Sequence, residues 1–286
     1  MSKFLDAFVE KISAVDNNVI RIAVIHGDAD PEVAELKPAI PCQNVYSIGK
    51  AFTVTAIGIL VDRGLLATDE TIPAALGKLC PDTYHPLWDK TTVHMLLQHK
   101  VGLTDFRLNI NSEDVASFGD DYLRHTMNQP LAEDHGTVSR YTDAAFYILS
   151  CVVENRAGMP LDTFLWREVF LPLGFREAAW SSCPRGHAMG ATGLFAAAKD
   201  IVKLGAVYMH GGVWKDKRIV SQRWVDTVLD NHYELSPRGD GSAYGKGGMN
   251  GQNLLVIPDQ QRVVAWQAAT DLGQEGMMEF AISYRE

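Results

Sequence analysis

The sequence has neither a long apolar segment nor a leader-like N-terminus. The longest charge-free apolar run near Lys50 covers residues 51–61, which is too short to cross a bilayer. The N-terminal stretch MSKFLDAFVEKISAV carries charges throughout and lacks the apolar core of a secretory signal. We therefore expect a chain that is not bound to a membrane and is not exported, with the cytoplasm as its location.

Cysteine is scarce, and several familiar motifs are missing. The four cysteines stand at positions 42, 80, 151 and 183, without the spacing of metal ligands, so we expect free thiols in a reducing compartment. No G-x-S-x-G nucleophile elbow, H-E-x-x-H zinc motif or phosphate-binding loop is present. We expect neither a metal nor an organic cofactor.

Positive charge is in short supply. The chain has 26 Lys and Arg against 35 Asp and Glu, a formal net charge of −9, and no basic patch. Nucleic acid is therefore not an expected partner. With 286 residues, of which 47% are hydrophobic, and no repeat or linker, the chain can bury a large core in one domain or in two packed lobes.

The two chain ends differ in pattern from the middle. An alternating run rich in Val and Ile at 18–27 predicts a strand, and near the C-terminus Asn250-Gly251 (a type I′ hairpin signal) and Pro258-Asp259 separate three more strand-like runs. Helices are predicted over 3–14, 46–63, 91–99, 143–157, 162–169 and 197–209.

This arrangement predicts an α/β fold of the α+β type, an antiparallel sheet built from both chain ends and flanked by helices. We expect a single catalytic domain over residues 1–286. Its sheet lobe would come from about 1–45 and 240–286, and its mainly helical insertion lobe from about 46–239.

The segment 46–61 is apolar nearly all round and has one charge, Lys50. A helix of this kind is normally buried, and Ser47 and Lys50 at i and i+3 share one of its faces. Burial disfavours the charged form of an amine, and a neutral lysine can act as a base toward a serine hydroxyl. The alternative is that Ser47 is only a helix cap and that Lys50 extends to the surface.

Two further groups of residues could take part in catalysis or in substrate binding. Tyr141 stands just before the predicted helix 143–157 and could relay protons, or it could be a packing residue with Asp143 as the helix cap. Lys246-Gly247-Gly248 could hold a substrate carboxylate or developing negative charge, with the glycines marking close approach of a ligand or of backbone. The alternative is a glycine-rich edge strand with a solvated lysine.

Taken in order, these groups resemble the serine β-lactamase and penicillin-binding-protein family, whose signature is S-x-x-K, Tyr/Ser-x-Asn and K-T-G. The resemblance is closest to the branch of class C β-lactamases, D,D-peptidases and related esterases. It extends over nearly the whole chain, through the segments VYSIGKAFTVTAIGILVDRGLLATDETI, TTVHMLLQHKVGL, RYTDAAFYILSCVVENRAGMPL, VFLPLGF and AMGATGLFAAAKDIVKLG.

The resemblance implies a β-lactamase/transpeptidase-like fold and a role for each matched residue. Ser47 would be the nucleophile, Lys50 its activating partner and Tyr141 a second proton-transfer group. Lys246 would take the place of the K-T-G lysine, and the backbone N–H groups of Ser47 and Met249 would form the oxyanion hole.

The chain also departs from the family pattern. Asp143 stands where asparagine is usual, and Gly247 where threonine is usual. Asp143 removes an amide donor, and Gly247 removes a hydroxyl that often meets a substrate carboxylate. Both changes favour a substrate other than the cell-wall peptide.

The sequence therefore predicts a serine hydrolase that forms an acyl-enzyme on a small ester or amide substrate. A β-lactamase or a D-alanyl-D-alanine carboxypeptidase is the alternative within the class. A catalytically silent homologue that binds a ligand or partner is the alternative from another class. The expected partner is a small ester, amide or β-lactam, and the oligomeric state is left open.

Overall fold

The computed structural model describes residues 1–104, 108–111 and 113–285. The helices are α1 (Lys3–Ser13), α2 (Gly49–Asp62), α3 (Ile72–Leu76), α4 (Val93–Leu97), α5 (Tyr122–Met127), α6 (Asp143–Ala157), α7 (Leu161–Leu165), α8 (Ala198–Met209), α9 (Gln222–Asn231) and α10 (Met277–Ser283). The strands are β1 (Val19–His26), β2 (Glu32–Glu35), β3 (Gln43–Asn44), β4 (Ala179–Trp180), β5 (Leu194–Ala196), β6 (Val213–Trp214), β7 (Lys217–Arg218), β8 (Ser236–Arg238), β9 (Ala243–Gly248), β10 (Gln252–Ile257) and β11 (Arg262–Ala268).

These elements form two compact units. The first contains residues 1–51, 168–179 and 194–286, and the second contains 52–167 and 180–193. The division differs from the predicted lobes, because residues 194–239 cluster with the sheet rather than with the helices. The physical reason is that α8 packs directly against β1, β10 and β11. The single catalytic domain stays a prediction.

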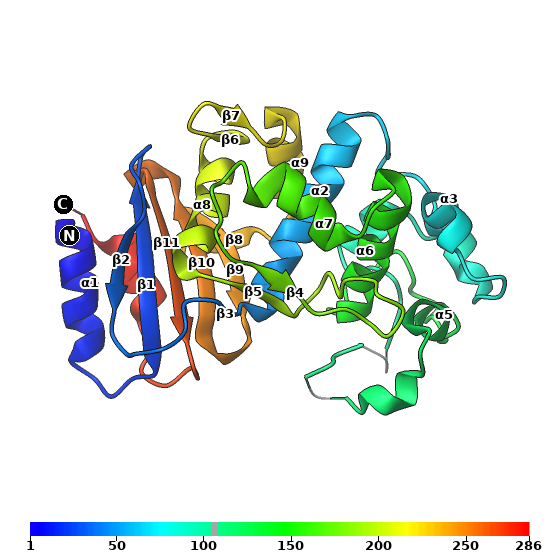
Figure 1. The fold of residues 1–286 in the computed structure, drawn as a ribbon, viewed down its shortest axis with the longest axis horizontal. Coiled ribbons are helices and arrows are strands. Elements are labelled where there is room, and N and C mark those ends of the chain that lie inside the picture. The colour runs from blue at the N-terminus through cyan, green and yellow to red at the C-terminus, as the bar shows by residue number, and fades with distance from the viewer. Residues whose placement is uncertain (105–107, 112, 286) are drawn as a thin grey trace. The chain divides into compact units, whose positions relative to one another are not determined.

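A six-stranded sheet dominates the first unit, in the order β2-β1-β11-β10-β9-β8 (Figure 1). Each neighbouring pair is antiparallel, and β1 lies between β2 and β11, with Val24 opposite Val264. The prediction of an antiparallel sheet from both chain ends is confirmed.

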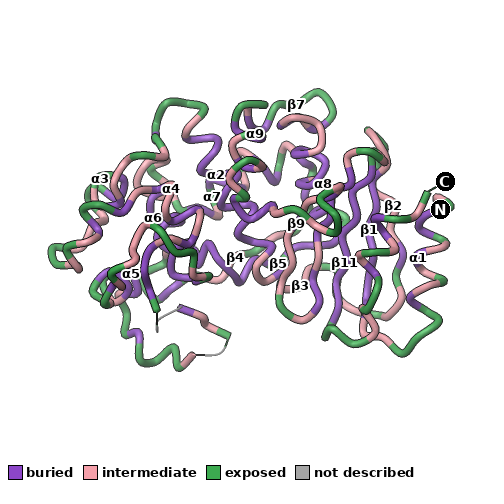
Figure 2. The backbone as a smooth tube through the Cα atoms, turned by 180° about the vertical axis from the view of Figure 1, so that it is seen from behind, coloured by how far each residue is buried: buried purple, intermediate pink, exposed green. Residues whose placement is uncertain are grey.

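Both faces of this sheet are covered, and its central strands are accordingly buried along their length (Figure 2). On one face α1 and α10 contribute to a core cluster that contains Phe8, Trp266 and Ile282. On the other face α8 approaches closely at Gly205, where an added Cβ would lie 2.4 Å from Val263 Cγ1. A glycine at this position lets the helix backbone sit against the strands.

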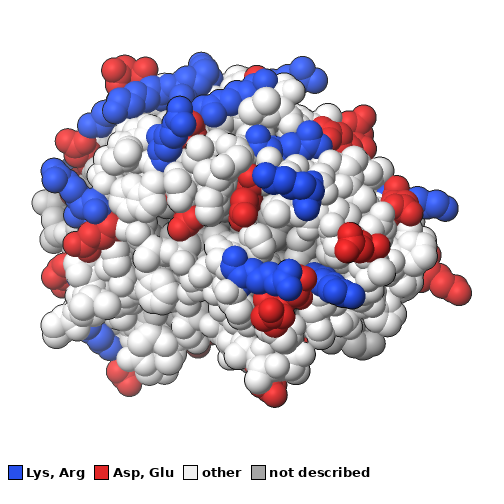
Figure 3. Space-filling view, turned by 45° about the vertical axis from the view of Figure 1, so that its right-hand side comes forward, with Lys and Arg blue, Asp and Glu red and all other residues white. Residues whose placement is uncertain are grey.

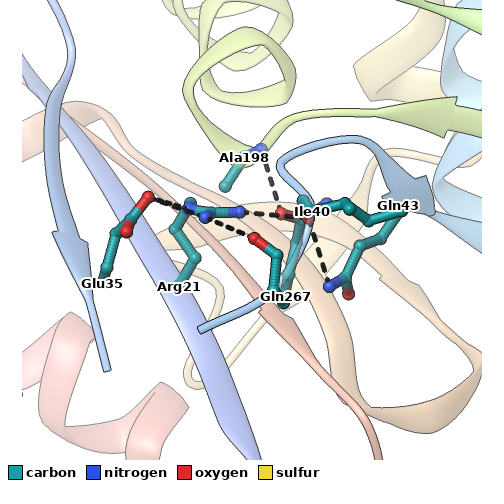
Figure 4. A network of polar contacts seen from close by, with 7 residues as sticks. Arg21, Glu35, Ile40, Gln43, Ala198 and Gln267 are labelled. Carbon is teal, nitrogen blue, oxygen red and sulfur yellow. Dashed lines mark hydrogen bonds and ion pairs between the residues drawn. The ribbon is translucent and has the colours of Figure 1, made fainter. Parts of the chain in front are cut away.

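A polar network ties this sheet to the segment that leads toward Ser47 (Figure 4). The buried guanidinium of Arg21 donates to Glu35 Oε1 over 2.7 Å and to the carbonyl of Ile40 over 3.5 Å. Gln43 donates to the same carbonyl, and Gln267 accepts from the backbone N–H of Ala198. Arg21 therefore links β1 to β2 and to the segment before β3, and Gln267 links β11 to the start of α8.

In the second unit, α6 is the central helix. Its side chains from Asp143 to Val153 are all buried, and Gly158 follows the helix with a φ of +69°. The bounds 143–157 agree with the sequence prediction, but the cap does not. Thr142, not Asp143, is the N-cap, because its hydroxyl accepts from the backbone N–H of Ala144 over 3.2 Å.

Other general expectations can be compared with the described residues. The four cysteines there are free thiols. None of the helices in the described ranges is long and apolar enough to span a membrane, and the cytoplasmic location stays a prediction. On the face drawn in Figure 3, acidic and basic side chains lie among one another.

Candidate active site

The turn that carries Ser47 has an unusual backbone. Tyr46 has a φ of +48°, in the left-handed region, and opens a short 3-10 turn (Tyr46–Ile48) that runs directly into α2. A non-glycine residue there costs on the order of 1–3 kcal/mol and needs support from its surroundings. Asn44 Oδ1 accepts from the Tyr46 backbone N–H, and Asn250 Nδ2 donates to Tyr46 Oη, each over 2.9 Å.

Ser47 and Lys50 meet at the start of α2. Lys50 has no exposed surface, and its Nζ lies 3.2 Å from Ser47 Oγ. The alternative in which Lys50 extends to the surface is therefore wrong. Its amine is therefore enclosed by protein and in contact with the Ser47 hydroxyl.

The strand β9 runs beside this turn. A Cβ added to Gly248 would lie 2.5 Å from the carbonyl oxygen of Val45, a distance that side chains do not tolerate. Gly248 is therefore required for close backbone approach, as its position in the sequence predicted. Gly247 is different, because the nearest atom to its added Cβ is the carbonyl oxygen of Gln252 at 3.9 Å.

The turn after β9 joins it to β10 through Met249, Asn250 and Gly251. Gly248 is paired with Gln252, so the loop has three residues, one more than the predicted two-residue type I′ turn. Asn250 and Gly251 both have positive φ, which is why this residue pair marked a hairpin. Met249, whose backbone N–H was expected to donate to the oxyanion, lies in this loop and is 44% exposed.

Lys246 is not solvated, so the alternative of a solvated lysine is wrong, although the pairing of β9 with β8 ends at Gly245, just before Lys246. β9 lies between β8 and β10, and the Lys246 side chain is only 12% exposed. Its Nζ forms an ion pair with Glu234 Oε2, and the Glu234 side chain is 3% exposed. The cation expected to meet a substrate anion thus already has an internal counter-ion.

Tyr141 and Asp143 belong to the second unit. Tyr141 is 46% exposed, and its ring lies 4.6 Å from the ring of His99, measured between centroids. His99 is 7% exposed, has a φ of +56°, and its Nδ1 accepts from the backbone N–H of Thr142. Asp143 is 6% exposed in the first turn of α6, where the helix dipole favours a carboxylate.

The structure thus brings together, in the first unit, Ser47 with Lys50 and the glycine-rich end of β9. No group of three or more His, Cys, Asp or Glu residues that could hold a metal occurs among the described residues.

Comparison with known proteins identifies the family of this chain. The Beta-lactamase family model matches residues 43–279. The chain belongs to the beta-lactamase family.

Individual relatives of this family member are distant in sequence. It is 23% identical to a 6-aminohexanoate-dimer hydrolase of Paenarthrobacter ureafaciens over 77% of this chain and 64% of the relative. It is 32% identical to the esterase EstB of Burkholderia gladioli over 48% of this chain and 38% of the relative. The chain therefore matches less than two thirds of the length of either relative.

A solved structure shows that the fold is that of the beta-lactamase family. A structure described as a 6-aminohexanoate-dimer hydrolase from Bacillus anthracis superposes with a TM-score of 0.77 at 15% identity, over 93% of this chain and 78% of that one. At this identity the match is evidence for the fold alone. It confirms the β-lactamase/transpeptidase-like architecture predicted from the sequence.

Three residues of this beta-lactamase family member were missed by the sequence analysis. Glu234 contacts Lys246, and the ring of His99 packs near that of Tyr141. Glu234 stands at no spacing that marks it, whereas His99 lies in the segment TTVHMLLQHKVGL, which resembles the family but did not single this residue out. Asn250 was read only as a turn residue, whereas its side chain also binds Tyr46. Contacts of this kind join segments far apart in the chain, and local patterns do not report them.

Proposed function

We propose that the protein is a serine hydrolase that works through an acyl-enzyme on small ester or amide substrates. The observation that carries the proposal is the buried amine of Lys50 at 3.2 Å from Ser47 Oγ. A surface lysine would be charged and solvated, whereas this one is placed to take a proton.

The proposed reaction has two halves. Lys50 accepts the hydroxyl proton as Ser47 Oγ forms a bond to the substrate carbonyl carbon, and the carbonyl oxygen becomes an anion. Backbone N–H groups of Ser47 and Met249 would hold that anion, each contributing roughly 3–4 kcal/mol to the transition state. The carbon–leaving-group bond then breaks, and the leaving group takes a proton from Tyr141.

In the second half, a water molecule attacks the acyl-enzyme. Tyr141, which gave its proton to the leaving group, would take one from the water, and Lys50 would return its proton to Ser47 Oγ as the acyl bond breaks. The free acid and the starting enzyme result. The roles of Tyr141, Met249 and Lys246 rest on the family pattern in the sequence.

Two departures from the family pattern and the names of two relatives support the choice of substrate class. Gly247 lacks the hydroxyl of the usual threonine, and Asp143 lacks the amide of the usual asparagine. Two relatives carry the names 6-aminohexanoate-dimer hydrolase and esterase EstB. We therefore favour a small ester or amide over a β-lactam or a cell-wall peptide.

An active-site probe tests the proposal. A fluorophosphonate should add its mass at Ser47, and Ser47→Ala should abolish both labelling and ester hydrolysis. Ser139→Ala, which removes an exposed serine, is the matched control and should label normally. Lys50→Met should label roughly 10²–10⁴-fold more slowly, the usual contribution of a general base. Labelling that persists in Ser47→Ala would refute the mechanism.

A substrate panel separates the alternatives. Turnover of p-nitrophenyl acetate or butyrate, with no turnover of nitrocefin or D-alanyl peptides, is expected. Acylation and hydrolysis of nitrocefin or penicillin would instead indicate the β-lactamase or penicillin-binding class. A silent ligand-binding homologue would give no acylation at any pH between about 6 and 10.

A further inference from the structure

Glu234 occupies a backbone conformation that carries strain. Its φ is +64°, and the backbone N–H of Leu235 donates to the carbonyl of Tyr233 over 2.8 Å. This is a γ-turn with a positive φ at its central residue, a rare arrangement for a residue with a side chain. Such outliers persist where surrounding structure holds them, and they concentrate at functional sites.

The strain coincides with a buried charge pair. The Glu234 and Lys246 side chains are 3% and 12% exposed, and they form an ion pair. Removing one partner of such a pair leaves the other charge uncompensated inside the protein. The Glu234–Lys246 pair is thus a buried ion pair and not an exposed surface contact.

Strand geometry places the pair beside the Ser47 turn. Residues at i and i+2 share a face of a strand, so Lys246 projects from the same face as the Cβ position of Gly248. That position faces the carbonyl of Val45, two residues before Ser47. Lys246 therefore stands about 7 Å along the strand from the point where β9 touches the turn.

The next cation on the neighbouring strand lies farther away. Arg238 is paired with Ala243, three residues before Lys246 on β9. It is therefore roughly 10 Å beyond Lys246, in the direction away from the turn. Among the residues of β8, β9 and β10, Lys246 is therefore the charged residue nearest to the Ser47 turn along the strands.

We propose that Glu234 sets the charge selectivity of the candidate active site by neutralising Lys246. The site then accepts acyl substrates that are uncharged near the scissile bond and discriminates against those with a carboxylate there. This inference rests on the proposed function, because it names the substrates of the same site. A lysine without Glu234 would attract a substrate carboxylate, whereas the pair offers no net charge to it.

Matched substrates test the inference. 4-Nitrophenyl butyrate and 4-nitrophenyl hemisuccinate differ by a carboxylate in the acyl part, and phenyl acetate and 3-carboxyphenyl acetate differ by one in the leaving group. At low ionic strength, where charges are least screened, kcat/KM of the wild type should be at least tenfold lower for the charged member of one or both pairs. Equal rates within both pairs would overturn the inference.

Variants then identify the residue responsible. Glu234→Gln should reduce the preference for the neutral substrate at least tenfold, and Lys246→Gln should increase it about threefold or more. The double variant, which removes both charges, should stay within about threefold of the wild-type ratio. Using a ratio of two substrates separates charge selectivity from any general loss of activity.

A matched control is present in the same unit. Asp200 and Lys203 on α8 form an ion pair of nearly the same burial, 2% and 11% exposed, so Asp200→Asn should leave the substrate ratio unchanged. A folded Glu234→Gln that labels at Ser47 but keeps the wild-type ratio would overturn this inference alone. Absence of Ser47 labelling and of ester hydrolysis in the wild type would overturn the proposed function and this inference with it.

Discussion

At the scale of single residues, the spacing of Ser47 and Lys50 explains how much of the site could be predicted. Residues at i and i+3 of a helix must face the same way, so the sequence alone predicted their contact, and the structure places the two atoms 3.2 Å apart. Glu234 could not be predicted in this way. It comes from a strained turn after α9 and meets Lys246 only because β8 and β9 pair.

Local pattern also failed to distinguish which of two neighbouring residues caps α6. Thr142 and Asp143 are both good cap residues, and the sequence analysis chose Asp143. The structure has an extended backbone at Thr142 and a helical one from Asp143 onward. The choice depends on where the preceding chain enters, which is fixed in part by the contact of the Thr142 N–H with His99.

Cys42 gives a prediction of pH dependence at this scale. Burial, and then the nearby Glu177 charge, raise the pKa of the Cys42 thiol to about 11. Because the thiolate is the reactive form, iodoacetamide should alkylate Cys42 at pH 8 roughly 100-fold more slowly than it alkylates the denatured chain. Alkylation rates from pH 7 to 11, read at Cys42 by peptide mapping, measure this.

The raised pKa of Cys42 also determines how the stability of the fold changes with pH. The folded pKa lies above the unfolded value of 9.0, so the contribution of Cys42 is fully present below pH 9 and is lost as the pH rises through 11. Cys42→Ser should remove that alkaline loss. Equal alkylation rates in the folded and denatured protein at pH 8 would contradict the prediction.

At the scale of elements, the junction of β9 with the Ser47 turn depends on one of two adjacent glycines. Gly248→Ala should lower the free energy of unfolding by about 1–3 kcal/mol, because its methyl group would meet the Val45 carbonyl at 2.5 Å. It should also slow labelling at Ser47, because either the strand or the turn must move. Urea denaturation and the labelling rate are the measurements.

Gly247→Ala is the matched control for stability. The space around its added Cβ is open to 3.9 Å, and alanine restricts the unfolded chain more than glycine does, so stability should be unchanged or slightly higher. Equal losses of stability in the two variants would show that flexibility, and not close approach, explains the glycine pair.

At the scale of the whole molecule, the pattern of strand-like ends around a helical middle was enough to predict a sheet shared by both ends. It was not enough to place α8, which was assigned to the helical lobe but packs against the sheet, and it did not predict α9. The chain ends also bring helices that the sequence analysis predicted only in part. α1 was expected and α10 was not, and the two meet where Phe8 stacks on Phe280 at 5.8 Å.

This meeting of the ends predicts a global effect from a single N-terminal side chain. Phe8 is fully buried and also contacts Trp266 of β11, with ring centroids 5.9 Å apart. Phe8→Ala should lower the free energy of unfolding by about 3–5 kcal/mol, a large part of what a typical protein has. Glu10→Ala on the exposed side of the same helix should change it by less than about 0.5 kcal/mol.

Urea denaturation followed by tryptophan fluorescence measures both variants. A loss of only about 1 kcal/mol or less in Phe8→Ala would show that α1 is a dispensable attachment to the sheet.

The pairing of β1 with β11 has a consequence for how the protein is made. During translation β1 is made well before its partner β11, because Val19 pairs with Ala268, far along the chain. Until then one long side of β1 has no strand to join, and its valine and isoleucine side chains lack their final neighbours. This strand therefore stays exposed to aggregation until Arg262–Ala268 has been synthesised, so the sheet can be completed only late in folding.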